Sequence, residues 1–210
     1  MANSNNICIQ VFAKAPIPGL SKTRLIPALG PQQAASFHAQ LCRHTLTTAS
    51  QAFPGQVELW CHPSVHHDFF RNCADEFQLS VFQQKDGDLG QKMHHALSHA
   101  LNRGKQAILI GTDCPAFRAH HFNKIIDILR TKDMAFAPAD DGGYVLVAAK
   151  HTEQAIFKNV DWGSRHVWQQ TQQHLATQQL SWQAIEALWD IDTPDDLQTH
   201  QHALQAMGLC

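Results

Sequence analysis

Short apolar runs alternate with helix-like stretches through about the first 150 residues. Continuous apolar runs rich in β-branched residues are typical of strands buried on both faces, whereas apolar residues spaced three and four apart indicate one face of a helix. The first pattern predicts strands at 7–13, 57–61, 79–82 and 107–110, and the second predicts helices at 31–52, 64–76, 93–101 and 122–129. This alternation predicts right-handed crossovers and a mostly parallel sheet.

The pattern changes in the last third of the chain. Two strand-like runs at 134–138 and 144–149 are joined by an Asp-Asp-Gly-Gly turn. This turn is too short for a helical crossover, so it predicts an antiparallel ribbon or a sharp bend. Helical spacing returns at 164–178 and 194–206. Because no repeat and no linker rich in Gly, Ser or Pro divides the chain, we expect one α/β domain over residues 1–210 with a mostly parallel, mixed central sheet.

The composition narrows the class of protein. Hydrophobic residues make up 44% of the chain and charged residues 16%, which is typical of a globular protein and not of a disordered one. The formal net charge of -2, without any basic run, argues against a general nucleic-acid binder. No apolar run is long enough to span a bilayer, and the N-terminal residues lack the pattern of a signal peptide. We therefore expect a cytoplasmic protein.

Cysteine and histidine are frequent, but neither follows a ligand pattern. The six cysteines are scattered and include no Cys-x-x-Cys pair, which predicts free, buried thiols rather than disulfides or a zinc site. The 15 histidines include the adjacent pairs 66–67, 94–95 and 120–121. Adjacent residues of a helix do not share a face. We therefore expect these histidines to lie on the surface.

The loop after the first predicted strand is the first candidate site, because ligands of open α/β sheets bind outside the carboxyl ends of the strands. Residues 14–25 are rich in Pro and Gly and carry Lys14, Lys22 and Arg24 without any acidic residue. Unpaired cations at this edge favour a phosphate chain, and the alternative is an ordinary solvated basic loop. The segment is not a P-loop, because Ser21 and Pro16 stand where that motif needs glycine.

Two further segments follow strands. Asp113 comes directly after the strand at 107–110, where it could hold a divalent cation or a substrate hydroxyl, or only cap the next turn. Residues 140–144 read Asp-Asp-Gly-Gly-Tyr. The glycines would let the backbone approach a ligand closely and the acids would accept hydrogen bonds from hydroxyls, but Asp-Gly is also a strong signal for a plain turn.

The last candidate segment is Asp-Ile-Asp-Thr-Pro-Asp-Asp-Leu at 190–197. Thr193 fits the N-cap of a helix whose first turn contains Pro and two acids, which assigns Asp195 and Asp196 a structural role. Asp190 and Asp192 precede the cap, so this helix start does not explain them. One of them could meet Asp113 across a hard cation such as magnesium, which prefers oxygen ligands.

These segments together resemble the nucleotide-diphospho-sugar transferase superfamily, the glycosyltransferase-A (GT-A) type. The run VFAKAPIPGLSKTRLIPALG is similar to the nucleotide-binding loop of a small bacterial family of GT-A-like transferases of unassigned specificity, and its KTRL core is similar to that of the phospholactate guanylyltransferases. The segments GDLGQKM, IGTDCP, DDGGYVL and DIDTPDDL match the small family in order and spacing. The resemblance covers nearly the whole chain.

The resemblance implies a three-layer α/β/α nucleotide fold and a role for each motif. Lys22 and Arg24 would contact the phosphates and act in catalysis with Asp113, and Mg²⁺ or Mn²⁺ would be held by Asp113 and Asp192. The implied nucleotide-binding residues are Lys14, Gly19, Lys22, Thr23, Arg24, Leu89 and Gly90, the last two near the nucleobase. The implied substrate-binding residues are Asp141, Gly142, Gly143 and Tyr144.

One departure bears on the reaction. Glycosyltransferases of this type carry Asp-x-Asp after the central strand, whereas Asp113 here is followed by Cys114 and Pro115. The resemblance therefore favours nucleotidyl transfer from an NTP to a small phosphorylated or acidic acceptor. A glycosyltransferase that uses a nucleotide sugar and a catalytically silent nucleotide-binding protein are the alternatives. In each case the expected partners are a nucleotide or nucleotide-sugar donor and a small-molecule acceptor, with no nucleic acid and no membrane span.

Overall fold

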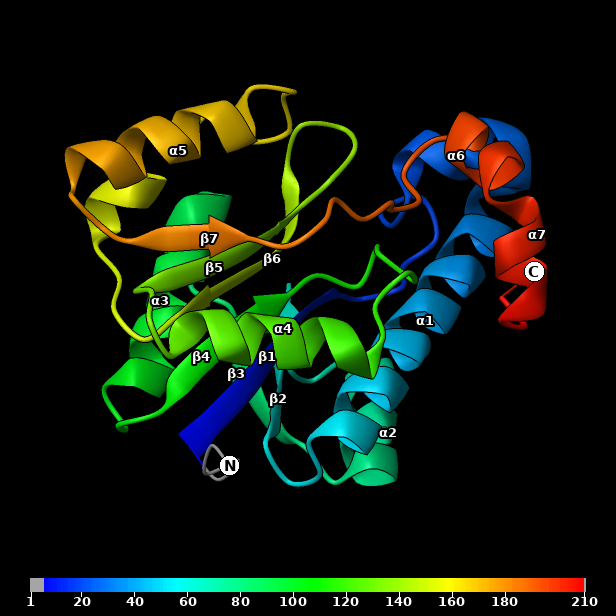
Figure 1. Cartoon of the computed structure of the whole chain (residues 1–210). Coiled ribbons are helices and arrows are strands. Elements are labelled where there is room, and N and C mark those ends of the chain that lie inside the picture. The colour runs from blue at the N-terminus through cyan, green and yellow to red at the C-terminus, as the bar shows by residue number, and fades with distance from the viewer. Residues whose placement is uncertain (1–5, 210) are drawn as a thin grey trace.

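The computed structural model describes residues 6–209, which fold around one seven-stranded sheet (Figure 1). The strands are β1 (Ile7–Lys14), β2 (Val57–His62), β3 (Ser80–Gln83), β4 (Gln106–Ile110), β5 (Met134–Pro138), β6 (Tyr144–Ala149) and β7 (Trp182–Ala184). Their order across the sheet is β3-β2-β1-β4-β6-β5-β7. Neighbours are parallel except at β6, which runs antiparallel to both β4 and β5. The predicted mixed, mostly parallel sheet and its antiparallel ribbon are confirmed.

Helices cover both faces of the sheet and make the predicted three layers (Figure 1). The helices are α1 (Ile26–Ala52), α2 (Asp68–Phe77), α3 (Leu89–Leu101), α4 (Ala119–Leu129), α5 (Val167–Thr177), α6 (Pro194–Thr199) and α7 (Gln201–Ala206), with short 3-10 turns η2 (Thr23–Leu25) and η3 (Gln154–Phe157). The apolar faces of α1, α2 and α4 pack together against one side of the sheet. Those of α3, η3 and α5 pack against the other side.

The burial of β1 explains its continuous apolar run. Ile9 and Val11 are buried in the core on the side of α1, while Cys8 is buried on the side of α3. Each face of the central strand is therefore covered, as the sequence predicts. In α1, Gly30 has φ 74° and interrupts the helix, so that the long helical part begins at Pro31, where the sequence places its start.

Some boundaries differ from the prediction. The helix expected from residue 64 begins only at Asp68, because the ring of His67 accepts a hydrogen bond from the backbone nitrogen of Phe69 and caps it. The last helix is broken at His200 into α6 and α7, and no Gly or Pro marks this break. Three-residue β7 was not predicted, because so short a strand carries no periodic signal.

The cysteines are as expected, but the histidines are not. Cys8, Cys42, Cys61, Cys73 and Cys114 are free and buried, and Cys210 lies outside the described residues. His38 and His121 are buried, so the expectation of surface histidines is wrong for both. Within residues 6–209, no helix is long and apolar enough to cross a membrane.

Candidate functional site

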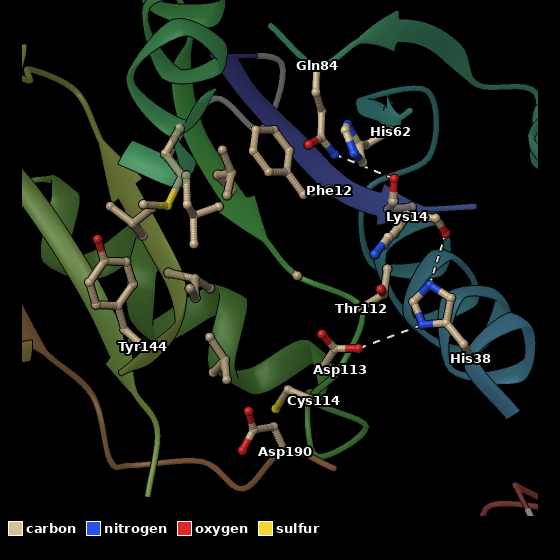
Figure 2. Close-up of a pocket in the computed structure, with 18 residues that line it drawn as sticks. Phe12, Lys14, His38, His62, Gln84, Thr112, Asp113, Cys114, Tyr144 and Asp190 are labelled. Atoms are coloured by element: carbon tan, nitrogen blue, oxygen red, sulfur yellow. Dashed lines mark hydrogen bonds and ion pairs between the residues drawn. The ribbon is translucent and has the colours of Figure 1, made fainter. Parts of the chain in front are cut away.

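A cavity of about 330 Å³ opens where β1 and β4 end, at the predicted edge of the sheet (Figure 2). Phe12 and Lys14 line it from β1, and Thr112 and Asp113 line it from the turn after β4. A second cavity of about 190 Å³ adjoins it and is lined by the basic loop, including Lys22, Thr23 and Arg24, together with Asp113 and Asp192. The basic loop, Asp113 and Asp192, which were predicted separately, therefore lie together at this edge of the sheet.

Lys22 lies between Asp113 and Asp192 and contacts both. Its Nζ lies 2.7 Å from Oδ1 of Asp113 and 2.8 Å from Oδ1 of Asp192. It also donates a hydrogen bond to the backbone oxygen of Ile191. The Lys22 side chain is only 4% exposed. The two carboxylates predicted to share a cation thus converge, but in this structure they converge on an ammonium group.

Local structure explains how these residues reach one another. The backbone nitrogen of Ile191 donates to the backbone oxygen of Asp113 at 2.9 Å, which ties the 190–192 segment to the end of β4. The carboxylate of Asp196 accepts from the backbone nitrogens of Asp192 at 3.0 Å and Thr193 at 2.7 Å. Asp196 is therefore structural, as predicted, and Asp192 is left free to face the basic loop.

The basic loop is held in a defined shape by Ser21. The hydroxyl of Ser21 donates to the backbone oxygen of Ala15 at 2.7 Å and accepts from the backbone nitrogen of Ile17 at 2.8 Å. Lys22 has a left-handed backbone, with φ 48°, which turns its side chain inward at the start of η2. Gly19, with φ 81°, lies in the preceding turn.

The cations of this loop are not unpaired, so this part of the prediction is wrong. Lys14 donates to the backbone oxygen of Leu20 at 2.7 Å. Arg24 is 63% exposed, and its Nη1 lies 3.5 Å from Oδ2 of Asp192. The partner acids are remote in sequence: Asp192 is 170 positions from Lys22. The prediction considered only residues close in sequence, and these do not include Asp192. The absence of acids within the loop therefore did not mean that its cations lack ion-pair partners.

The pKa values show how strongly the buried charges interact. Burial works against the charge of Lys22, but Asp113 and Asp192 outweigh it and raise its pKa above the ordinary value. Burial likewise opposes the charge of Asp113, but the Lys22 ammonium holds its pKa below the ordinary value. Burial lowers the pKa of His38, so this ring is neutral at pH 7. Lys22 and Asp113 are therefore both ionised in this cluster.

Two buried acceptor atoms of the cluster have few partners. His38 Nε2 lies 2.9 Å from the backbone oxygen of Lys14 and must carry the proton, so Nδ1 has a lone pair. Nδ1 lies 3.8 Å from Oδ1 of Asp113, which places two acceptors face to face (Figure 2). Among the described residues Nδ1 of His38 has no hydrogen-bond partner, and Nζ of Lys22 is the one donor that reaches Oδ1 of Asp113. Such buried acceptors mark a place for a donor or a cation.

Asp190 was left open by the sequence and proves to belong to the site. It lines the large cavity and two neighbouring ones. Burial, together with the nearby carboxylates of Asp141 and Asp192, raises the pKa of Asp190 to about 7. Asp113, Asp190 and Asp192 therefore form a group of carboxylates that repel one another when no further positive charge is present.

The Asp-Asp-Gly-Gly-Tyr segment contributes only in part. Asp141, Gly143 and Tyr144 line a cavity of about 170 Å³ next to Asp190. Gly142 instead packs on the backbone oxygen of Arg165, which a Cβ would approach to 2.2 Å. Asp141 also accepts a hydrogen bond from the backbone nitrogen of Gly143 at 2.8 Å, as in an ordinary turn. The turn and the packing of Gly142 account for part of this segment, and a substrate-binding role for Asp141, Gly143 and Tyr144 stays a prediction.

Of the two residues expected near a nucleobase, Leu89 lines the large cavity and Gly90 does not. Leu89 is 45% exposed, which is unusual for a leucine. An added Cβ on Gly90 would lie 2.5 Å from the backbone oxygen of Phe157. Gly90 is thus required for the packing of α3. His38 and Gln84, which also line the cavity, were missed because single buried polar residues carry no motif.

A second group of metal-ligand type lies elsewhere. Ligand atoms of His120, His121 and Glu186 all lie within 4.8 Å of one another. Nδ1 of His121 accepts a hydrogen bond from the backbone nitrogen of Arg118 at 3.1 Å, so Nε2 carries the proton of the neutral ring. Lys124 already contacts Glu186 at 2.5 Å. This group is therefore poorly suited to a metal ion.

Comparison with known proteins agrees with this architecture. Residues 45–164 match the model of a family described as "Uncharacterized protein conserved in bacteria (DUF2064)". The 3-phospho-D-glycerate guanylyltransferase of Colwellia psychrerythraea is 27% identical over 184 residues, covering 86% of this chain and 85% of that protein.

Solved structures share the fold over most of the chain. A crystal structure from Desulfovibrio desulfuricans G20, provisionally assigned as a nucleotide-diphospho-sugar transferase, has a TM-score of 0.85 and 26% identity, covering 95% of this chain and 88% of that one. Rv0371C of Mycobacterium tuberculosis in complex with manganese has a TM-score of 0.54 and 18% identity, covering 92% of this chain and 97% of that one. The nucleotide-diphospho-sugar transferase fold expected from the sequence is confirmed.

Proposed function

The chain belongs to the DUF2064 family, and from this premise we propose that it is a divalent-cation-dependent nucleotidyltransferase that uses an NTP and a small phosphorylated or acidic acceptor. The observation that carries the proposal is the meeting of Lys22 with Asp113 and Asp192 beside the large cavity. The guanylyltransferase relative supports the same class of reaction, because it matches most of both chains.

The residues present fit a divalent cation. Asp113 and Asp192 come from separate segments and converge on one point, and among the described residues the buried Oδ1 of Asp113 is reached by the Lys22 ammonium alone. Carboxylate oxygens are the ligands that Mg²⁺ and Mn²⁺ prefer. The bound cation would neutralise charge on the donor phosphates. We propose Asp113 and Asp192 as its ligands.

This proposal requires Lys22 to move. An ammonium and a cation cannot both lie between the two carboxylates, so Lys22 must give up at least one of its contacts when a cation binds. The released Nζ would remain in the cavity shared with Arg24 and Thr23. Lys22 and Arg24 would then contact the donor phosphates, and Lys14 and the turn at Gly19 would position the loop.

The chemical step is an in-line substitution at the α-phosphorus. An anionic oxygen of the acceptor forms the new P–O bond, the bond to the β-phosphate oxygen breaks, and pyrophosphate leaves with the electron pair. Lys22 and Arg24 stabilise the negative charge that develops on the phosphates, so the protein contributes positioning and electrostatics. The smaller cavity lined by Asp141, Gly143 and Tyr144 contains no basic residue, so we place a hydroxyl-bearing part of the acceptor there and not its acidic group.

Glycosyl transfer is the weaker alternative. The second Asp of an Asp-x-Asp pair is replaced by Pro115, and Cys114 between them is buried. The additional carboxylates come instead from the 190–192 segment. This arrangement supports nucleotidyl transfer, and the similarity to a guanylyltransferase supports the same reaction.

A product screen tests the proposal. The purified protein is incubated with Mg²⁺ or Mn²⁺, each of the four NTPs and a panel of phosphorylated carboxylic acids that includes 3-phosphoglycerate. We expect pyrophosphate and a nucleotidylated acid with at least one pair. Release of a nucleoside diphosphate from a nucleotide sugar, incubated in place of the NTP, would contradict the proposal in favour of glycosyl transfer. Nucleotide binding without any turnover would favour a silent binder.

A further inference from the structure

The large cavity contains a buried amide for which the proposed reaction gives no role. Gln84 directly follows β3 and lines the cavity, and it is only 8% exposed. Its backbone nitrogen donates to the backbone oxygen of Cys61 at 2.9 Å, which anchors the residue to the end of β2. A buried amide in a fixed position beside a cavity is well suited to recognise a ligand by hydrogen bonding.

The hydrogen bonds of Gln84 fix which atom faces the cavity. Nε2 donates to the backbone oxygen of Trp60 at 2.9 Å and lies 3.5 Å from that of Ala13. Rotating the amide by half a turn would place Oε1 against these two oxygens, so the observed orientation is strongly preferred. Figure 2 shows Oε1 on the side of Phe12, facing into the cavity. No donor among residues 6–209 bonds to this oxygen.

The position of Gln84 separates it from the charged cluster. Gln84 lies at one end of the cavity, while Asp113 and Asp190 lie at the other (Figure 2). The walls between them are mainly apolar and include Phe12, Met93 and Leu109. An apolar slot with a single oriented acceptor suits a flat heteroaromatic ring. His62, at the same end, adds no charge at pH 7, because burial lowers its pKa.

We propose that Gln84 determines nucleobase specificity and that its Oε1 accepts hydrogen bonds from N1–H and the N2 amine of guanine. The inference rests on the proposed nucleotidyl transfer and names its donor. Guanine presents two neighbouring donors on one edge, whereas adenine and cytosine place a ring acceptor beside their amine. Uracil has one donor between two acceptors. An oxygen with two available lone pairs matches guanine best.

Binding measurements with modified bases test this inference in the unchanged protein. Dissociation constants are measured by calorimetry with Mg²⁺ and GTP, ITP, N1-methyl-GTP, ATP, CTP and UTP. ITP lacks the N2 amine and N1-methyl-GTP lacks the N1 proton. We expect GTP to bind most tightly and each analogue to bind about tenfold more weakly.

A variant then identifies the responsible group. Gln84→Leu removes the acceptor and should bind GTP and ITP equally, with GTP weakened about tenfold to a hundredfold. Gln83→Leu is the matched control, because the Gln83 side chain bonds to Pro63 and Val65 outside the cavity. This control should keep the preference for GTP over ITP.

The outcomes separate the two proposals. If the wild type binds triphosphates but does not distinguish GTP from ITP and N1-methyl-GTP, the role of Gln84 is wrong and nucleotidyl transfer stands. The same conclusion follows if Gln84→Leu keeps the preference. If the wild type binds no triphosphate, both proposals fail. Should Gln84→Leu not fold, the analogue series in the wild type decides alone.

Discussion

The protein contains two buried charge clusters, around Glu58 and around Lys22, that differ in how many donors reach their buried carboxylate oxygens. Glu58 on β2 is 8% exposed in its side chain. Its carboxylate accepts from Gln10 Nε2 at 3.2 Å and Trp60 Nε1 at 3.1 Å, and it pairs with Arg103. Burial opposes the charge of Glu58, but these hydrogen bonds outweigh it and hold its pKa below the ordinary value. This carboxylate is fully satisfied by the fold.

The cluster of Lys22, Asp113 and Asp192 is incomplete by comparison. Lys22 is as buried as Glu58, yet among the described residues Oδ1 of Asp113 has Lys22 as its single donor and Nδ1 of His38 has none. This cluster lines cavities, whereas Glu58 lines none of those described above. The difference indicates that a satisfied buried charge serves stability and that an unsatisfied one beside a cavity serves a ligand.

The largest expected effect is on catalysis by Asp113→Asn. The substitution removes a proposed cation ligand, so the rate of pyrophosphate release should fall by about 10³-fold or more, equivalent to several kcal/mol of transition-state stabilisation. Asp127→Asn on the surface of α4, where Asp127 pairs only with Arg130, is the control. A variant of Asp113 that keeps most of the activity would remove this carboxylate from the reaction.

The next largest effect is on stability and concerns the Glu58 cluster. Glu58→Gln breaks the buried pair with Arg103 and should lower the free energy of unfolding by about 2–4 kcal/mol, measured by urea denaturation at pH 7. Nucleotide binding should remain unchanged. Glu76→Gln, which breaks the more exposed pair with Arg43, should cost less than about 1 kcal/mol.

The pH dependence provides a check on Glu58. Because its pKa is lower in the folded than in the unfolded protein, its contribution to stability is complete above the ordinary value of 4.5. The contribution is lost as the pH falls through the lowered pKa of the folded state. The stability of Glu58→Gln should therefore decrease less below pH 4.5 than that of the wild type. Parallel curves would show that Glu58 has no such role.

Lys22→Met should have an effect of intermediate size on cation binding. Without the ammonium, Asp113 and Asp192 repel each other and would bind Mn²⁺ about tenfold more tightly in the absence of nucleotide. Free Mn²⁺ is measured by electron paramagnetic resonance. Lys150→Met, at an exposed position directly after β6 and outside the site, should leave Mn²⁺ binding unchanged. Unchanged or weaker binding by Lys22→Met would show that lysine and cation do not compete.

The smallest effect is expected for Arg24→Ala. Arg24 is 63% exposed, so its contact with a phosphate is screened by water and its loss should weaken nucleotide binding about fivefold. The melting temperature should barely change. Arg71→Ala, another exposed arginine, on α2, serves as the control in the same titration. Equal affinities for all three proteins would remove Arg24 from the phosphate site.

Much of the fold could be predicted from the sequence, because buried parallel strands and amphipathic helices leave strong periodic patterns. The ends of β5 and β6 are those expected, and the restart of α1 at Pro31 follows from a local signal. The break at His200 leaves no such signal. The short strand β7 forms by pairing with β5, which is distant in sequence, so residues near β7 do not predict it.

The site could be predicted at the level of segments but not of contacts. The loop at 14–25, Asp113 and Asp192 lie together as expected, because strand ends meet at one edge of a sheet. The ion pairs of Lys22 depend on partners far away in sequence. Gly90 and Gly142 look like ligand-binding glycines but are needed for packing, which only the neighbouring backbone of Phe157 and Arg165 reveals.

A crystal structure with Mn²⁺ and a non-hydrolysable GTP analogue would test the assignment of the catalytic centre most directly. We expect an anomalous peak between Asp113 and Asp192, about 2.1 Å from a carboxylate oxygen of each, with Nζ of Lys22 moved to the nucleotide phosphates. A peak elsewhere, or Lys22 still between the two carboxylates with nucleotide bound, would contradict it.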